Sequence, residues 1–238
     1  VNLGACLGEL GCRVLVVDAD PQGNATSGLG IDRDDIDLSV YDCLINDVDT
    51  NSALLETDFQ GVWVLPSSIH LAGAEVELVG LDKREHRLRR IVGKVREDYD
   101  YIFIDCPPSL GLLTVNALVA ADSVLIPIQC EYYALEGLTQ LLSTIKLVRG
   151  RLNANLDIEG VLLTMFDGRT NLSIQVADEV KRFFREKVYS TIIPRNVRLS
   201  EAPSHGKPIT IYDNRSKGAE VYRELAEEVL RRAQEGVR

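Results

Sequence analysis

Apolar and polar residues alternate along the chain in the pattern of an α/β protein. Short apolar runs typical of buried strands occur at residues 13–20, 62–66, 101–108, 123–129, 159–166 and 188–194. Elsewhere apolar residues recur every three or four positions, which predicts helices at 1–11, 84–98, 112–121, 136–150, 173–187 and 218–234. This alternation favours one doubly wound domain over residues 1–238, with a mainly parallel sheet and helices on both faces.

The first predicted element is a helix, VNLGACLGELG, which leads directly into the apolar strand at 13–20. In a parallel sheet such a helix is the second half of a strand–helix–strand unit. The strand and loop that would precede it are not among residues 1–238. We therefore expect a sheet whose first strand and first loop are missing, although a natural start at Val1 is the alternative.

Two of the predicted strands end in carboxylates. The first ends at Asp18 and Asp20, and the strand at 101–108 contains Asp105. Open α/β sheets bind ligands at the carboxyl ends of their strands. An apolar strand ending in Asp is typical of the Walker B motif, in which the carboxylate holds Mg²⁺ through a water molecule, and a capping Asp is the simpler alternative.

The segments that follow these acids add to the evidence for a nucleotide site. PQGN follows Asp20 with backbone amides and an amide side chain, and CPPSLG follows Asp105 with a stiff proline pair. These features indicate a nucleoside-triphosphate site. The sequence contains no GxxxxGK[ST] loop, however, and such a loop belongs just before the first helix.

Charge is distributed unevenly along the chain. The formal net charge of -10 argues against a protein coated by nucleic acid. Residues 1–80 carry fourteen acidic and two basic side chains, whereas the rest carries 22 acidic and 24 basic ones. A DNA contact is therefore expected only on a local patch. The five cysteines form no CxxC pair and no apolar run is long enough to span a membrane, which favours a cytoplasmic protein.

Four segments resemble the ParA family of chromosome- and plasmid-partitioning ATPases, and in particular its small chromosomal members called Soj. They are VNLGACLGELGCRVLVVDADPQGNATSGLGI, YDYIFIDCPPSLGLLTVNAL, IPIQCEYYALEGL and IPRNVRLSEAPSHGKPI. The resemblance covers essentially the whole chain. It implies a P-loop NTPase-like fold, and it implies that the family's deviant Walker A loop, KGGVGKTT, stands immediately before Val1.

The resemblance also implies an ATPase that uses ATP and Mg²⁺, with roles for particular residues. Asp20 matches the switch I aspartate that helps position the attacking water, and it is also a candidate metal ligand. Asp18 matches a nearby acid of the magnesium and phosphate network. Asp105 matches the Walker B acid, which holds Mg²⁺ through water.

A later loop is expected to hold the base of the nucleotide. Pro194, Arg195 and Asn196 match the family's adenine loop. The signature lysine and the phosphate-binding amides have no counterpart in residues 1–238. This stretch alone is therefore expected to bind ATP poorly or not at all.

In the family that this chain resembles, ATP drives formation of a homodimer that binds DNA without sequence preference. Such binding needs a few Lys or Arg side chains on phosphates. The candidates are Arg169, Arg195, Arg198 and Lys207. The resemblance further implies a ParB-like (Spo0J-like) partner that stimulates hydrolysis, and a cytoplasmic, nucleoid-associated protein that segregates chromosomes or plasmids.

Two other functions remain open at this point. One is a membrane-cycling positioner of cell division similar to MinD, which would need a basic amphipathic helix at its end. The last predicted helix instead sets Glu220, Glu224, Glu227 and Glu228 opposite its apolar face, which argues against a membrane partner and for docking on the sheet. The other is a catalytically dead, truncated relative that only binds partners.

Overall fold

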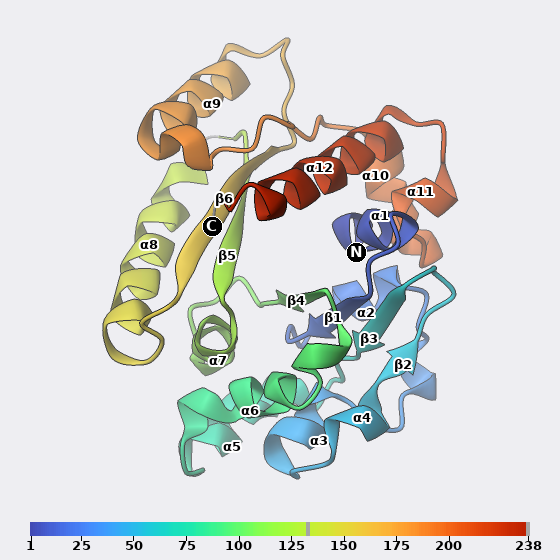
Figure 1. Cartoon of the computed structure of the whole chain (residues 1–238), viewed down its shortest axis with the longest axis vertical. Helices are drawn as coiled ribbons and strands as arrows, with labels where there is room; N and C mark the ends of the chain where they lie inside the picture. Colours follow the sequence, from blue (N-terminus) through green and yellow to red (C-terminus); the bar gives the residue numbers. More distant parts are fainter. Residues whose placement is uncertain (132–133, 237–238) are drawn as a thin grey trace.

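The computed structural model describes residues 1–131 and 134–236, without the side chains of residues 134–136. Its strands alternate with helices along the chain, as the sequence pattern predicts (Figure 1). The strands are β1 Val14–Asp18, β2 Leu55–Glu56, β3 Val62–Leu65, β4 Tyr101–Asp105, β5 Ser123–Gln129 and β6 Asp157–Thr164. All pairs between them are parallel except the short β2–β3 pair, so the mainly parallel α/β class is confirmed.

Helices cover both faces of these strands. They are α1 Asn2–Glu9, α2 Asn24–Gly28, α3 Val40–Ile45, α4 Thr50–Ala53, α5 Leu71–Val79, α6 Arg87–Gly93, α7 Leu112–Ala120, α8 Ala134–Arg151, α9 Asn171–Phe184, α10 Val197–Glu201, α11 Ile209–Tyr212 and α12 Lys217–Gln234. Short 3₁₀ turns stand at Arg33–Asp35, Arg84–His86, Arg96–Asp98, Arg185–Lys187 and Ala202–His205. None of the described helices is long and apolar enough to cross a membrane.

Strand β1 shows why both faces need helices. Its five residues are all buried. Leu15 and Val17 pack in one core with α3, α5, α6 and α7, whereas Val14 and Val16 pack in another with α1, α2 and α12. Successive side chains of a strand point to opposite faces, so a run without polar residues requires cover on both sides. The burial of α12 against this second face confirms that the last helix docks on the sheet.

Among the described residues, the strands form two sheets that do not pair with each other. One has the order β2-β3-β1-β4, and the other contains β5 and β6. Within the described residues, β4 therefore has a paired neighbour on one side only, and so does β5. In Figure 1 β5 lies on the side of β4 that faces away from β1.

Several sequence-based boundaries were wrong, and hydrogen bonds explain two of them. The segment 188–194 is not a strand, because the amides of Ser190 and Thr191 bond to the Glu228 carboxylate and only isolated bridges to its neighbours remain. Residues 24–28 form a helix rather than a loop, and here Asp18 accepts a bond from the Thr26 amide.

Three further differences concern helices. The predicted helix at 84–98 is divided into α6 and flanking 3₁₀ turns, with the Asn116 side chain accepting a bond from the Leu88 amide at 3.1 Å. Helix α5 was not predicted from the sequence pattern at all. Glu228, placed by sequence on the outer face of the last helix, is only 3% exposed.

Candidate functional site

The three predicted acids meet at one edge of the larger sheet. Asp18 is the last residue of β1 and Asp105 the last of β4, and the two are partners in the β1–β4 register. Asp20 follows Asp18 after one residue, and the Ala19 amide donates to the Asp105 carbonyl at 2.8 Å. The parallel register therefore brings together residues that lie 87 positions apart in sequence.

Asp18 is fully buried and both of its carboxylate oxygens accept hydrogen bonds. Oδ2 accepts from the Thr26 amide at 2.7 Å and from the Thr26 hydroxyl at 2.6 Å, and Oδ1 accepts from the Asp20 amide at 3.3 Å. Burial raises the pKa of the Asp18 carboxyl, and these bonds oppose that shift. Asp18 thus fastens the start of α2 to the end of β1.

Two residues complete this network although the sequence analysis did not single them out. The Thr26 hydroxyl, besides donating to Asp18, accepts a bond from the Ser67 amide at 3.0 Å. The Ser67 hydroxyl donates to the Asp20 carbonyl at 2.7 Å. The clue in the sequence is positional, because Ser67 follows the end of β3 and so shares the carboxyl edge with the acids.

Asp20 and Asp105 are the acids that solvent can reach. Asp20 is half-buried and its Oδ1 accepts from the Gln22 amide at 2.9 Å. Asp105 is exposed, yet partial desolvation by the surrounding protein and then repulsion from Asp18 raise the pKa of its carboxyl. A bound cation relieves such repulsion, and carboxylate oxygens suit a hard divalent ion.

The loop after Asp105 is fixed at its far end. The Thr114 hydroxyl donates to the Ser109 carbonyl at 2.6 Å. Glu75 of α5 accepts from the Leu113 amide at 3.1 Å, in the first turn of α7. The proline-rich loop is therefore held between β4 and two anchors on helices.

The predicted base-binding loop lies at the end of β6. Pro194 forms an isolated bridge with Phe166, and the Arg195 amide donates to the Phe166 carbonyl at 3.0 Å. Asn196 caps α10 by accepting from the Leu199 amide at 3.3 Å. This side chain is therefore already committed to its own helix.

The candidate DNA-binding residues fall into two groups. Arg169 and Arg195 lie beside Asp167, and together they lower the pKa of that carboxyl, Arg169 most strongly. Arg198 pairs with Glu201 at 2.9 Å and Asp213 at 3.4 Å.

The ion pairs leave these side chains accessible. Arg169 forms an ion pair with Asp167 at 2.7 Å yet its side chain is 88% exposed, and Arg195 pairs with Glu131. Among the described residues, no carboxylate lies within ion-pair distance of Lys207, which is exposed. Exposed pairs contribute only about 0–1 kcal/mol, so phosphates can compete for these arginines.

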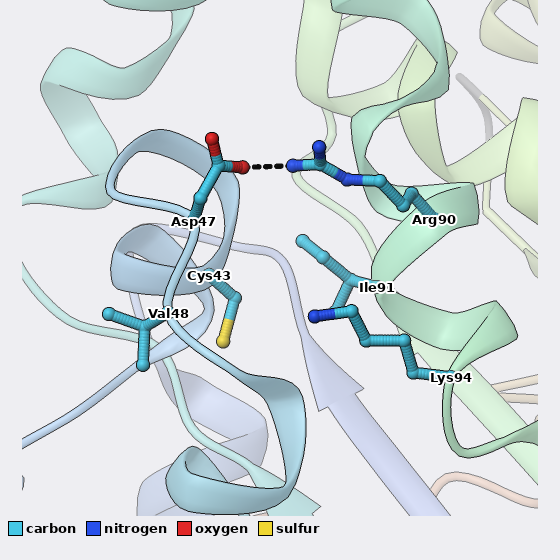
Figure 2. Close-up of a pocket in the computed structure, with 6 residues that line it drawn as sticks. All are labelled: Cys43, Asp47, Val48, Arg90, Ile91 and Lys94. Atoms are coloured by element: carbon cyan, nitrogen blue, oxygen red, sulfur yellow. Dashed lines mark hydrogen bonds and ion pairs between the residues drawn. The ribbon is translucent and has the colours of Figure 1, made fainter.

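A small pocket of about 110 Å³ lies between α3 and α6 (Figure 2). Its lining residues are Cys43, Asp47, Val48, Arg90, Ile91 and Lys94. The charged ones are paired, Asp47 with Arg90 and Lys94 with Asp49 at 3.2 Å. Because the charges satisfy one another, the pocket offers little to a charged ligand. Within the part of the chain that the structure describes, no group of three or more His, Cys, Asp or Glu could hold a metal by itself.

Comparisons with known proteins agree on one family. A family model described as an AAA domain matches residues 1–158. The chain is 65% identical over 229 residues to the sporulation initiation inhibitor protein Soj of Bacillus subtilis, which covers 96% of this chain and 90% of that protein. It is 56% identical over 232 residues to the chromosome partitioning protein ParA of Myxococcus xanthus, over 98% of this chain and 82% of that one.

A solved structure has the same fold. The cobyrinic acid a,c-diamide synthase of Mycobacterium smegmatis, with bound ADP and magnesium, has a TM-score of 0.85 and 41% sequence identity to this chain. The match covers 99% of this chain and 88% of that one.

Proposed function

This chain belongs to the Soj/ParA family of chromosome-partitioning ATPases, and from that membership we propose that it is an ATP-dependent dimerising switch. In the dimeric state it binds DNA without sequence preference, and with a ParB-like partner it segregates a chromosome or a plasmid. The observation that carries the proposal is the meeting of Asp18, Asp20 and Asp105 at one sheet edge. Position and residue type at this edge both fit a nucleotide with its metal.

We assign the acids different tasks. Asp105 and Asp20, whose carboxylates solvent can reach, would hold Mg²⁺, Asp105 through a water molecule. When bound with ATP, Mg²⁺ neutralises charge on the phosphates. Asp20 also orients the water that attacks the terminal phosphate. Asp18 keeps the Asp20 loop in place through Thr26, in addition to its electrostatic effect on the site.

The phosphates require a loop that residues 1–238 do not contain, and the sheet suggests where its strand lies. The facing sides of β4 and β5 have no strand partner in the described residues. Val1, before α1, lies within electrostatic reach of Asp18 and Asp105. A parallel strand in the break between β4 and β5 would end at the same edge, beside the start of α1. Helix N-termini bind phosphate well, and we therefore expect the phosphates near Val1.

We assign binding of the adenine and of DNA to loops in the later part of the chain. Pro194, Arg195 and Asn196 line the base, with Asn196 acting through its cap on α10. Arg169, Arg195, Arg198 and Lys207 contact DNA phosphates on the nucleoid. Because these contacts are electrostatic, affinity should fall steeply as salt rises.

The proposal is tested with the protein in its full-length form, ATP, Mg²⁺ and random duplex DNA. We expect retardation of the DNA that requires ATP and weakens with salt. Arg169→Glu and Arg198→Glu should each weaken binding, whereas Arg89→Glu, an exposed arginine of α6, should not. Failure of the unsubstituted protein to retard DNA under these conditions would remove the central claim.

Asp20→Ala tests the catalytic assignment. We expect it to abolish ATP hydrolysis while the ATP-bound dimer becomes long-lived. Asp34→Ala is a matched control, because Asp34 is an exposed acid of the following segment. Unchanged turnover in Asp20→Ala would show that Asp20 does not orient the water.

A further inference from the structure

Arg33 is one of two basic residues in the acidic first part of the chain, residues 1–80. It begins the 3₁₀ turn that follows α2, and its side chain is exposed. Three carboxylates adjoin it in sequence: Asp32, Asp34 and Asp35. Within the described part of the chain, Arg33 nevertheless forms no ion pair. Its guanidinium is held instead by the loop that carries Asp20.

The guanidinium of Arg33 contacts three parts of this loop. Its Nη2 donates a hydrogen bond to the Gln22 carbonyl, and its Nε donates to the Ser27 hydroxyl at 3.0 Å. Between these bonds it packs on Gly23, where a Cβ would come within 3.1 Å of Arg33 Cζ. Gly23 has a φ of 61°, a conformation that glycine adopts without strain. One planar side chain therefore spans the loop from Gln22 to Ser27.

Gln22 links this contact to the carboxylate of Asp20. The Gln22 amide donates to Asp20 Oδ1 at 2.9 Å. The next peptide unit, which joins Gln22 to Gly23, is held at both ends: its N–H donates to the Asp20 carbonyl at 2.9 Å, and its carbonyl accepts from Arg33. Because a peptide unit is planar, these two bonds fix its orientation and restrict the backbone of Gln22. Arg33 thereby helps to aim the amide that holds Asp20.

The other contacts of Asp20 reach its backbone rather than its carboxylate. Asp18 accepts from the Asp20 amide at 3.3 Å, and the Ser67 hydroxyl donates to the Asp20 carbonyl at 2.7 Å. In the described residues, the bond from the Gln22 amide is the one that the carboxylate accepts from the protein, and it uses Oδ1. The orientation of Oδ2, which is left for a ligand, therefore depends on the loop that Arg33 closes.

We propose that Arg33 is a positioning residue for ATP hydrolysis, which acts through Gln22 to hold the Asp20 carboxylate in the orientation that the attacking water needs. The inference rests on the task that the proposed function gives to Asp20. A small displacement of a group that orients a reactant slows the chemical step, even where binding is unchanged. Loss of Arg33 should accordingly lower the rate of hydrolysis more than the affinity for ATP.

The turn that contains Arg33 is suited to this task. The Asp32 carboxylate accepts from the Asp34 amide at 3.1 Å and so caps the turn from which the arginine extends. A charged donor also forms a stronger bond to a carbonyl than a neutral one does. Since the side chain is exposed, its truncation leaves no cavity in the core, and the variants used as tests should fold.

Steady-state hydrolysis by the full-length protein with Mg²⁺ tests the assignment. Arg33→Ala should lower kcat about tenfold and leave KM for ATP within about twofold, as expected when a charge-assisted hydrogen bond that orients a loop is lost. Arg33→Lys should keep kcat within about threefold, because the ammonium group can still donate to the Gln22 carbonyl. Arg13→Ala removes the other basic side chain of residues 1–80, also exposed, and should change neither constant by more than about twofold.

Hydrogen exchange gives a readout that does not depend on hydrolysis. In Arg33→Ala the amides of Gln22 and Gly23 should exchange faster, because the loop is released on one side. The Thr26 amide, which bonds to buried Asp18, should be unchanged. The midpoint of chemical denaturation should also match that of the unsubstituted protein.

The outcomes separate this inference from the proposed function. If Asp20→Ala abolishes hydrolysis but Arg33→Ala leaves kcat unchanged, the assignment of Arg33 is wrong and the switch stands. Unchanged turnover in Asp20→Ala removes the task of Asp20 and this inference with it. A higher KM with unchanged kcat in Arg33→Ala would mean that Arg33 serves nucleotide binding. Faster exchange throughout the chain would mean that it supports the fold, and either result overturns the assignment.

Discussion

Helices α5 and α12 both pack against the sheet, but the side chains on their solvent-facing sides differ in polarity. In α12 the buried positions include Val221, Leu225 and Val229, and the outer positions are mostly charged. In α5 the buried positions are apolar too, but the outer positions include the exposed Val76 and Val79 as well as the charged Glu77. Helix α12 exposes mainly charged side chains to solvent, whereas α5 also exposes apolar side chains, which the described residues of this chain do not cover.

The two helices also use buried or half-buried carboxylates differently. Glu228 of α12 binds the amides of Ser190 and Thr191 and the guanidinium of Arg232, and so fixes the segment beside β6. Glu75 of α5 binds a single amide next to the proline-rich loop. The Glu228 carboxylate therefore holds a whole segment in place through several bonds, whereas the Glu75 carboxylate makes one hydrogen bond beside a loop of the site.

The largest effect on stability should come from the inner faces of these helices. Leu78→Ala and Leu225→Ala each remove a fully buried side chain, and each should lower the free energy of unfolding by about 2–5 kcal/mol. Val76→Ala on the exposed face of α5 should change it by less than about 0.5 kcal/mol. Chemical denaturation measures all three, and an equal cost at Val76 would show that this side chain is covered within one chain.

The next largest effect on stability should come from Glu228 of α12. Burial alone would raise the pKa of Glu228, but the bonds from Ser190 and Thr191 outweigh it and lower that pKa to about 2. Glu228→Gln should therefore lower the free energy of unfolding at neutral pH by on the order of 3 kcal/mol.

The pH dependence of Glu228→Gln follows from the direction of this shift. A carboxyl whose pKa is depressed by folding stabilises the protein above its unfolded pKa, about 4.3, and loses this contribution as pH falls toward 2. The difference between the two proteins should accordingly narrow over that range. A constant difference from pH 7 to pH 2 would contradict the role of the charge.

The smallest effect should come from Glu75→Gln. The glutamine keeps an oxygen that can accept from Leu113 but loses the charge near the start of α7, which should cost about 0.5–1 kcal/mol. Hydrogen exchange should show faster opening at Leu113 and in the loop after Asp105, with the amides of β1 unchanged. Uniformly faster exchange would mean that Glu75 supports the core rather than this loop.

The alternation of strands and helices and the position of the acids can be predicted from the pattern of apolar and polar residues. Continuous apolar runs identify β1, which is buried on both faces, and β4, which is partly buried, and Asp18 and Asp105 end those runs. Strand β5 agrees with its prediction at both ends. The local sequence pattern is enough to predict a strand where a continuous run of apolar residues marks its burial.

Other features depended on contacts between distant residues, which no local pattern encodes. Segment 188–194 has the composition of a strand, yet Glu228 captures two of its amides. The network of Thr26 and Ser67 exists only because the ends of β1 and β3 are adjacent in the sheet. Helix α5 escapes a search for amphipathic periodicity because both of its faces are apolar.

Which residues could form a core, and which acids end the strands, can thus be read from hydrophobicity and position alone. Which acid is buried and which can reach a ligand depends instead on the residues that neighbouring strands bring beside it, and so it is known only from the folded protein. The tertiary structure also decided that, among the described residues, β4 pairs with a strand on one side only, and that Val76 and Val79 of α5 are exposed. The pairing of β4 and the exposure of α5 both depend on packing between residues that are far apart in the chain.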